Sequence, residues 1–180
     1  MKPFINALAT WIFIGIAAFT QGCDRVSTSP DDSQLTSVLN SFINEWHQDA
    51  AASNHAKYIG AMAEEGIYTG TDATEYWTTR EFSKWSRPYF EKGRAWNLQP
   101  IQRHIYIGHD GLTAWFDELL DTSMGLCRGS GVLQKKGDKW EICHYVLSPT
   151  IPNELTNEVK QLKRSQDSLL MEKIRHSPVK

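Results

Sequence analysis

The chain has 180 residues, of which 41% are hydrophobic and 22% are charged, a balance typical of one packed domain of ordinary size. Its formal net charge of −2 argues against a nucleic-acid-binding surface, which would usually be strongly basic. The sequence contains neither a Gly-rich phosphate loop nor a dinucleotide-binding fingerprint, and its histidines and cysteines lack the spacing of zinc ligands. We therefore expect no cofactor, no metal site and no nucleic acid partner.

Residues 1–23 have the pattern of a bacterial export signal. Lys2 precedes an almost continuous apolar run over 4–19, and the chain turns polar directly after Cys23. This run of about 16 residues is shorter than the roughly 20 that a membrane-spanning helix needs. Gly22 and Cys23 resemble the end of a lipobox, which implies acylation of Cys23 and a lipid anchor in the bacterial cell envelope. A cleaved signal without lipid, giving a periplasmic or secreted protein, and an uncleaved anchor are the alternatives.

The rest of the chain divides into three parts. Residues 24–33 are rich in Ser, Asp, Thr and Pro and are predicted to form a linker. Residues 34–155 are predicted to form the folded domain, and 156–180 a C-terminal helix with a short tail.

Three helices are predicted at the start of the domain. Apolar residues recur at helical spacing over 35–46, after a suitable N-cap at Ser33. A second, shorter helix is predicted over 53–63, and Thr78 with Glu81 has the pattern of a capping box that begins the third helix. The aromatic face of this third helix is interpreted as core rather than as a binding site; it carries Phe82, Trp85, Tyr89 and Phe90.

From residue 97 the hydrophobic period changes to two. After one short strand over 67–69, four strand-like runs are separated by Gly-containing turns and span 101–107, 112–121, 126–135 and 140–148. Short turns between consecutive strands predict an antiparallel meander. Helices followed by such a meander predict an α+β fold, with three N-terminal helices packed on a strongly bent antiparallel sheet and a final helix over 157–174.

Several stretches carry a family resemblance: TDAT at 71–74 with Trp77, RHI at 103–105, AWFDE at 114–118, CRGSGVL at 127–133 and YVLS at 145–148. They resemble a SnoaL-like branch of the nuclear-transport-factor-2-like (NTF2-like) superfamily over roughly 34–160. The resemblance implies a cone-shaped fold with an apolar cavity at its open end, and a homodimer formed through the sheets. The superfamily contains both enzymes and proteins without known chemistry, so function has to be argued from the site.

The turn lengths predict which strand residues face one another. If all three loops are even, His104 lies opposite Trp115, and Ser130 lies opposite Tyr145. The predicted pocket then has six residues, five from one face of the meander and Trp77 from outside it: His104, Trp115, Asp117, Arg128, Tyr145 and Trp77. The opposite face collects Arg103, Glu118, Gly129, Gly131 and His144. The predicted pocket residues other than Tyr145 each have a structural alternative to ligand binding. His104 is then a structural histidine, Asp117 and Arg128 form an ion pair inside the cone, and the tryptophans Trp77 and Trp115 belong to the core. One bulge would exchange the two faces.

Three functions remain open at this level. The first is an envelope protein that binds a small, largely apolar ligand in the cone. The second is an isomerase-, cyclase- or dehydratase-like enzyme that uses a cavity carboxylate or histidine for proton transfer. The third is a scaffold that acts by dimerisation, with the face carrying Gly129 and Gly131 as the predicted contact.

Overall fold

The computed structural model describes residues 30–93 and 95–177. The predicted signal, its acylation site Cys23 and residues 24–29 of the linker lie outside the described residues. Within the described part, no helix combines the length and the hydropathy that a membrane span requires.

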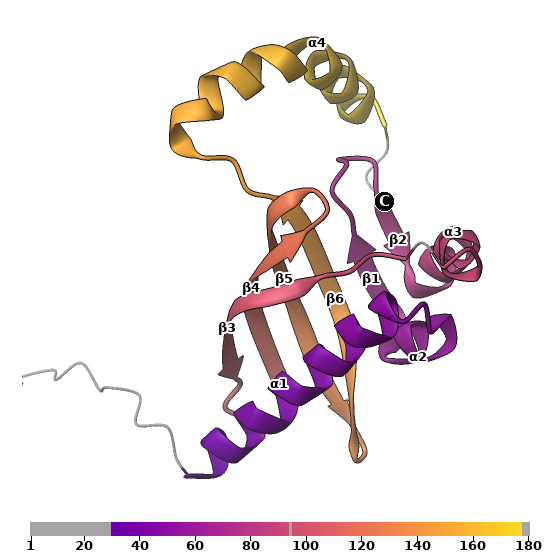
Figure 1. Cartoon of the computed structure of the whole chain (residues 1–180), viewed down its shortest axis with the longest axis vertical. Coiled ribbons are helices and arrows are strands. Elements are labelled where there is room, and N and C mark those ends of the chain that lie inside the picture. Colours follow the sequence, from indigo (N-terminus) through magenta and orange to yellow (C-terminus); the bar gives the residue numbers. More distant parts are fainter. Residues whose placement is uncertain (1–29, 94, 178–180) are drawn as a thin grey trace, which may run out of the picture.

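In the described residues, five helical segments and six strands follow one another (Figure 1). The helical segments are α1 (Pro30–Ala51), α2 (His55–Gly60), α3 (Thr79–Glu91), the 3₁₀ turn η1 (Asn153–Leu155) and α4 (Thr156–Arg175). The strands are β1 (Met62–Thr69), β2 (Tyr76–Thr78), β3 (Gln99–Ile107), β4 (Thr113–Thr122), β5 (Gly125–Lys136) and β6 (Lys139–Pro149).

All six strands form one sheet in the order β2-β1-β6-β5-β4-β3. The antiparallel meander from β3 to β6 is as predicted, but β1 joins the sheet parallel to β6, with Tyr68 beside Tyr145. The sheet bends around α1, and α2 and α3 pack at its β1–β2 side (Figure 1). The predicted α+β fold with helices on one face of a bent sheet and a C-terminal helix is confirmed.

Two predicted helix boundaries were wrong. α1 begins at Pro30, before the expected cap at Ser33, and proline is tolerated in a first turn because its missing N–H would have no partner there. α2 ends at Gly60, and the chain enters β1 at Met62 instead of continuing as a helix. The alternating burial of Met62, Gly66 and Tyr68 against the helices stabilises the longer strand.

The capping box that begins α3 is confirmed. The Glu81 backbone N–H donates to the Thr78 hydroxyl at 3.3 Å, and the Thr78 backbone N–H donates to Glu81 Oε2 at 2.9 Å. These two bonds satisfy backbone donors that the first helical turn leaves without partners. Pro88 lies inside the last turn of α3, which ends three residues later at Glu91.

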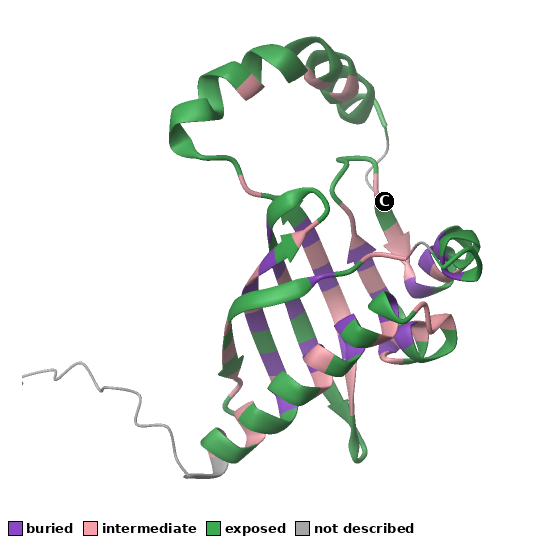
Figure 2. Cartoon of the chain, viewed as in Figure 1, coloured by how far each residue is buried: buried purple, intermediate pink, exposed green. Residues whose placement is uncertain are grey.

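The core lies between α1, α3 and the concave face of the sheet (Figure 2). Trp46 of α1 stacks on Tyr58 of α2 with ring centroids 4.8 Å apart, and Tyr68 of β1 stacks on Phe82 of α3 at 3.9 Å. Each such side chain contributes on the order of 1.5–3 kcal/mol when it leaves water. α4 buries none of its residues and stands away from this core (Figure 2).

The strand register departs from the even-loop prediction in two places. Leu119 faces Arg128 as predicted, but His104 faces Asp117 instead of Trp115, a shift of two that leaves the side-chain directions unchanged. On β6, Cys143 is an extra residue between the pairs Leu133–Ile142 and Val132–His144. A bulge of this kind reverses the direction of every following side chain relative to the partner strand.

Candidate functional site

The face predicted to line the cavity is the convex, outer face of the sheet. The His104 and Asp117 side chains are 51% and 47% exposed and are hydrogen-bonded at 3.1 Å, and Trp115 is 47% exposed. Arg128 is also exposed. The prediction that these four residues line a common cavity is therefore wrong. The helices cover the other face because it offers more apolar surface, with Ala114, Phe116, Leu120, Leu133 and Ile142.

Tyr145 and Trp77 have different positions from those four residues. The bulge at Cys143 turns Tyr145 into the core, where it lies opposite Gly131 and is fully buried. Trp77 on β2 is half-buried and lines a pocket, as described below. Neither His104 nor Asp117, which were predicted to share its face, lies on the same face as Tyr145. The prediction that all six residues bind a ligand together fails on geometry, whereas a ligand contact by Trp77 stays a prediction.

The face that carries Gly129 and Gly131 is the interior of the cone. Both glycines are buried, and a Cβ atom on Gly129 would overlap the Tyr145 hydroxyl and the Glu118 carboxylate. This face cannot be the predicted dimer contact, because α1 and the core already cover it. Dimerisation itself stays a prediction.

A buried carboxylate, Glu118, joins four elements at the centre of the cone. It is 1% exposed. Its Oε1 accepts hydrogen bonds from His47 Nε2 of α1 at 2.8 Å and from the Tyr145 hydroxyl of β6 at 2.9 Å. Its Oε2 accepts from Arg103 Nε of β3 at 2.8 Å, with Arg103 Nη2 in ion-pair contact at 2.7 Å.

The balance of these contacts keeps Glu118 ionised. Burial raises its pKa, whereas the hydrogen bond and charge of His47 and the charge and hydrogen bonding of Arg103 lower it, and the net pKa lies below the ordinary value. Arg103 in turn bonds the side chains of Asn40 and Asn44 on α1, both at 2.7 Å. Because both carboxylate oxygens already have partners, we interpret this cluster as a clamp between α1 and the sheet rather than as a substrate site.

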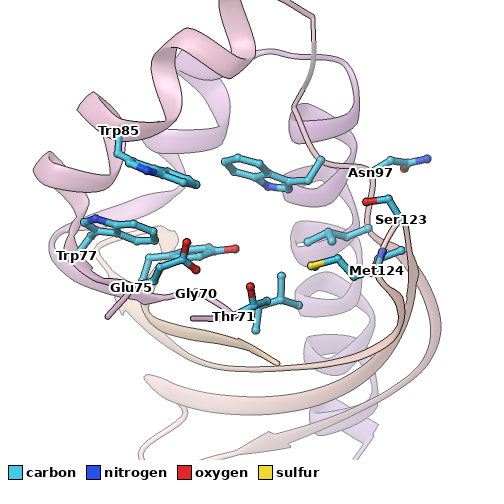
Figure 3. Close-up of a pocket in the computed structure, with 13 residues that line it drawn as sticks. Gly70, Thr71, Glu75, Trp77, Trp85, Asn97, Ser123 and Met124 are labelled. Carbon is cyan, nitrogen blue, oxygen red and sulfur yellow. The ribbon is translucent and has the colours of Figure 1, made fainter. Parts of the chain in front are cut away.

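The candidate functional site is a pocket at the open end of the cone, with a volume of about 220 Å³. The β1–β2 loop, α3, the segment before β3 and the β4–β5 turn surround it (Figure 3). The other hollows among the described residues that exceed this volume, up to about 830 Å³, have no comparable aromatic wall. The lining residues are Tyr68, Gly70, Thr71, Glu75, Trp77, Trp85, Trp96, Asn97, Leu98, Thr122, Ser123, Met124 and Leu147.

Three tryptophans form the upper wall of this pocket. The Trp77 and Trp85 rings stack with centroids 4.4 Å apart, and Trp85 lies 6.1 Å from Trp96. Phe82 packs behind all three at 5.7–5.9 Å. The Trp96 indole N–H donates to the Tyr58 hydroxyl at 3.0 Å, which holds this ring in place. Trp85, in the middle of the wall, is still 38% exposed.

The polar groups of the pocket come mainly from the β1–β2 loop. The Glu75 carboxylate lies beside Trp77 and Thr71 in Figure 3, and its Oε2 accepts a hydrogen bond from the Asp72 backbone N–H at 3.1 Å. Gly70 leaves space for this carboxylate, because a Cβ atom there would overlap it. Burial raises the pKa of Tyr68 above its ordinary value, and the negative charge of Glu75 raises it further. The hydrogen bond with Tyr58 lowers this pKa, but by less than burial raises it.

Sequence reasoning missed Glu75, Trp85 and Trp96 as pocket residues. Trp85 belongs to the aromatic helix face that was interpreted as core, and the periodicity of a helix does not distinguish core from pocket wall. Glu75 lies in a turn-rich loop, whose conformation depends on its own hydrogen bonds. Within the described ranges, no three His, Cys, Asp or Glu side chains gather as metal ligands would.

Comparisons with known proteins agree with this architecture. The family model of the SnoaL-like domain matches residues 39–152, more than half of the chain. No curated protein sequence matches the chain significantly.

Several solved structures share the fold. An NTF2-like protein of unknown function from Pseudomonas putida has a TM-score of 0.54 at 13% identity, and the match covers 68% of this chain and 91% of the Pseudomonas chain. An NTF2-like protein from Cytophaga hutchinsonii has a TM-score of 0.54 at 12% identity, covering 64% and 98%. A function-unknown protein from Mycobacterium tuberculosis has a TM-score of 0.56 at 12% identity, covering 73% and 82%. The chain therefore belongs to the SnoaL-like domain family, with an NTF2-like fold.

Proposed function

We propose that this protein binds a small, ring-bearing and largely apolar molecule in the tryptophan-walled pocket. The observation that carries the proposal is the wall itself, in which Trp77, Trp85 and Trp96 line one cavity. Ligand sites are usually concave and apolar with a few placed polar groups, and Thr71, Glu75 and other loop residues supply those groups here. Apolar area that a ligand buries against the indoles contributes roughly 25 cal/mol per Å².

The binding test uses indole N–H resonances as position-specific reporters. Benzyl alcohol, a neutral ring-bearing probe, is titrated into the ¹⁵N-labelled full chain in a non-ionic detergent. We expect the peaks of Trp77, Trp85 and Trp96 to shift saturably, with a Kd on the order of 1 mM. Trp46 in the core, Trp115 on the convex face and Trp140 should not shift, because none of them lines the pocket.

A matched pair of substitutions in one loop provides the control. Thr71→Phe places a ring in the pocket and should abolish the shifts, because Thr71 lines the cavity. Ala73→Phe adds the same ring to an exposed residue of the loop that does not line the cavity, and should leave binding unchanged. Shifts spread equally over all tryptophans, or a Thr71→Phe variant that binds normally, would contradict the pocket as the binding site.

A proton-transfer enzyme is the second candidate, and Glu75 is the observation that favours it. This carboxylate lines the pocket together with Tyr68. The raised pKa of Tyr68 keeps the Tyr68 hydroxyl protonated and able to donate a hydrogen bond. Of the two groups considered for proton transfer, a carboxylate or a histidine, none of the described lining residues supplies the histidine. Solvent deuterium entering a bound carbonyl compound at its α-carbon, and no longer entering with Glu75→Gln, would establish this activity; its absence with a bound carbonyl compound would argue against it.

We also propose that the protein is held at a membrane of the bacterial cell envelope by a lipid on Cys23. The support is the sequence alone: the apolar run over 4–19 followed by Gly22 and Cys23. Cells fed labelled palmitate should incorporate it into the wild-type protein and not into Cys23→Ala. Equal labelling of the two proteins would contradict the anchor, and the pocket proposal does not depend on the result.

A further inference from the structure

We infer that the pocket selects an organic cation, a molecule with a quaternary or alkylated ammonium group, by placing its charge between the tryptophan wall and the Glu75 carboxylate. This inference rests on the proposed function, because it names the chemical class of the ligand for the same pocket. Its evidence is the charge of the lining residues, the type of ring in the wall and the geometry of the Glu75 loop.

The charge of the lining residues favours a cation over an anion. Among the described residues, Glu75 is the one lining side chain that carries a charge at neutral pH. The remaining lining residues are uncharged: aromatic and aliphatic side chains, three hydroxyl residues, an amide, a methionine thioether and a glycine. An anionic ligand would meet a like charge here, whereas a neutral ligand would leave the carboxylate without a partner on the pocket side.

The aromatic wall is suited to the same charge. The face of an indole ring carries negative electrostatic potential, and tryptophan attracts cations more strongly than the other aromatic residues do. Such attraction operates within about 6 Å of a ring centroid. Trp77 and Trp85 stack with centroids 4.4 Å apart, so the faces that they turn to each other are covered, and a cation would contact the indole faces that the wall leaves open to the pocket.

The Glu75 carboxylate is oriented by hydrogen bonds within its own loop. Its Oε2 is held by the Asp72 backbone N–H at 3.1 Å, and the Glu75 carbonyl accepts from the Gly70 backbone N–H at 2.9 Å. In the described part of the chain, Oε1 accepts no hydrogen bond and remains available to a ligand. Because the loop orients the charge in advance, little conformational entropy is lost when a cation binds.

The test compares two ligands of the same shape that differ in charge. Choline carries a trimethylammonium group, and 3,3-dimethylbutan-1-ol has a tert-butyl group in its place. Each is titrated calorimetrically into the full chain in a non-ionic detergent, with a detergent-only titration subtracted. We expect choline to bind at least tenfold more tightly than the neutral alcohol.

Two charge-removing variants locate the source of this preference. Glu75→Gln keeps an oxygen that can accept from Asp72, and should reduce the choline preference over the neutral alcohol to less than threefold. Asp117→Asn removes one charge on the convex face and should keep the full preference, because Asp117 does not line the pocket.

The outcomes separate the two proposals. Equal binding of both probes to the wild-type protein would overturn the cation inference and leave the apolar pocket intact. A choline preference that survives Glu75→Gln would also overturn the role of Glu75 that the inference requires. If choline, the neutral alcohol and benzyl alcohol all fail to bind, the proposed function fails and the inference fails with it.

Discussion

Replacing Glu118 with alanine is expected to lower the free energy of unfolding by about 3–5 kcal/mol, since it removes one partner of a buried ion pair. The substitution leaves the nearly buried Arg103 guanidinium and His47 ring without the carboxylate that both contact at 2.7–2.8 Å. It also removes the acceptor of the Tyr145 hydroxyl. Chemical denaturation of the full chain in a non-ionic detergent, followed by tryptophan fluorescence, measures the loss.

The neighbouring residue provides the control. Asp117→Ala removes a carboxylate of similar size from the next position on β4, but its side chain is 47% exposed. An exposed ion pair contributes roughly 0–1 kcal/mol, so this variant should stay close to wild type. If the two variants lost equal stability, the clamp between α1 and the sheet would not have the importance that its burial indicates.

The same carboxylate predicts a dependence on pH. The pKa of Glu118 in the folded protein lies below its ordinary value, near which it titrates in the unfolded chain, at about 4.3. The ionised form therefore contributes stability that is fully present above about pH 4.3 and is lost as the pH falls through the folded pKa. Wild type should lose stability on acidification, and Glu118→Gln should lose less over the same range. Parallel pH profiles for the two proteins would contradict this.

Replacing Gly129 with alanine is expected to cost about 2–4 kcal/mol, which combines overpacking with the loss of a buried hydrogen bond. A Cβ atom at this position would lie 2.8 Å from Glu118 Oε1 and 3.0 Å from Glu118 Cγ, and it would overlap the Tyr145 hydroxyl. These atoms belong to the clamp and have no space to move. The variant should have a lower denaturation midpoint, without the shift from dimer to monomer that the sequence prediction implied.

A second glycine makes the comparison specific. Gly60 lies at the end of α2, and a Cβ atom there would meet nothing within 4 Å. Gly60→Ala should be neutral or stabilising by roughly 0.5–1 kcal/mol, because alanine loses less backbone entropy on folding. A Gly129→Ala variant as stable as Gly60→Ala would show that the packing around Glu118 is looser than the structure indicates.

Local patterns in the sequence were sufficient to predict the class of fold. Period-two runs separated by Gly-containing turns predicted the meander from β3 to β6, and the Thr78–Glu81 pattern predicted the start of α3. These features depend on residues that are close in the chain, so their physical causes are visible in the sequence. The parallel pairing of β1 with β6 was not predicted, because it joins segments that lie far apart in the chain.

The site was decided by tertiary structure. Alternation divides the strand residues into two faces, but it does not say which face the helices cover. The prediction that the more polar face with His104 and Asp117 lies inside is wrong for this reason. One extra residue, Cys143, then moved Tyr145 to the opposite face. The pocket brings together a loop carboxylate, Glu75, and tryptophans from separate elements, Trp77, Trp85 and Trp96. Such a grouping has no sequence signature, because packing free energy depends on which surfaces meet in space rather than on their order in the chain.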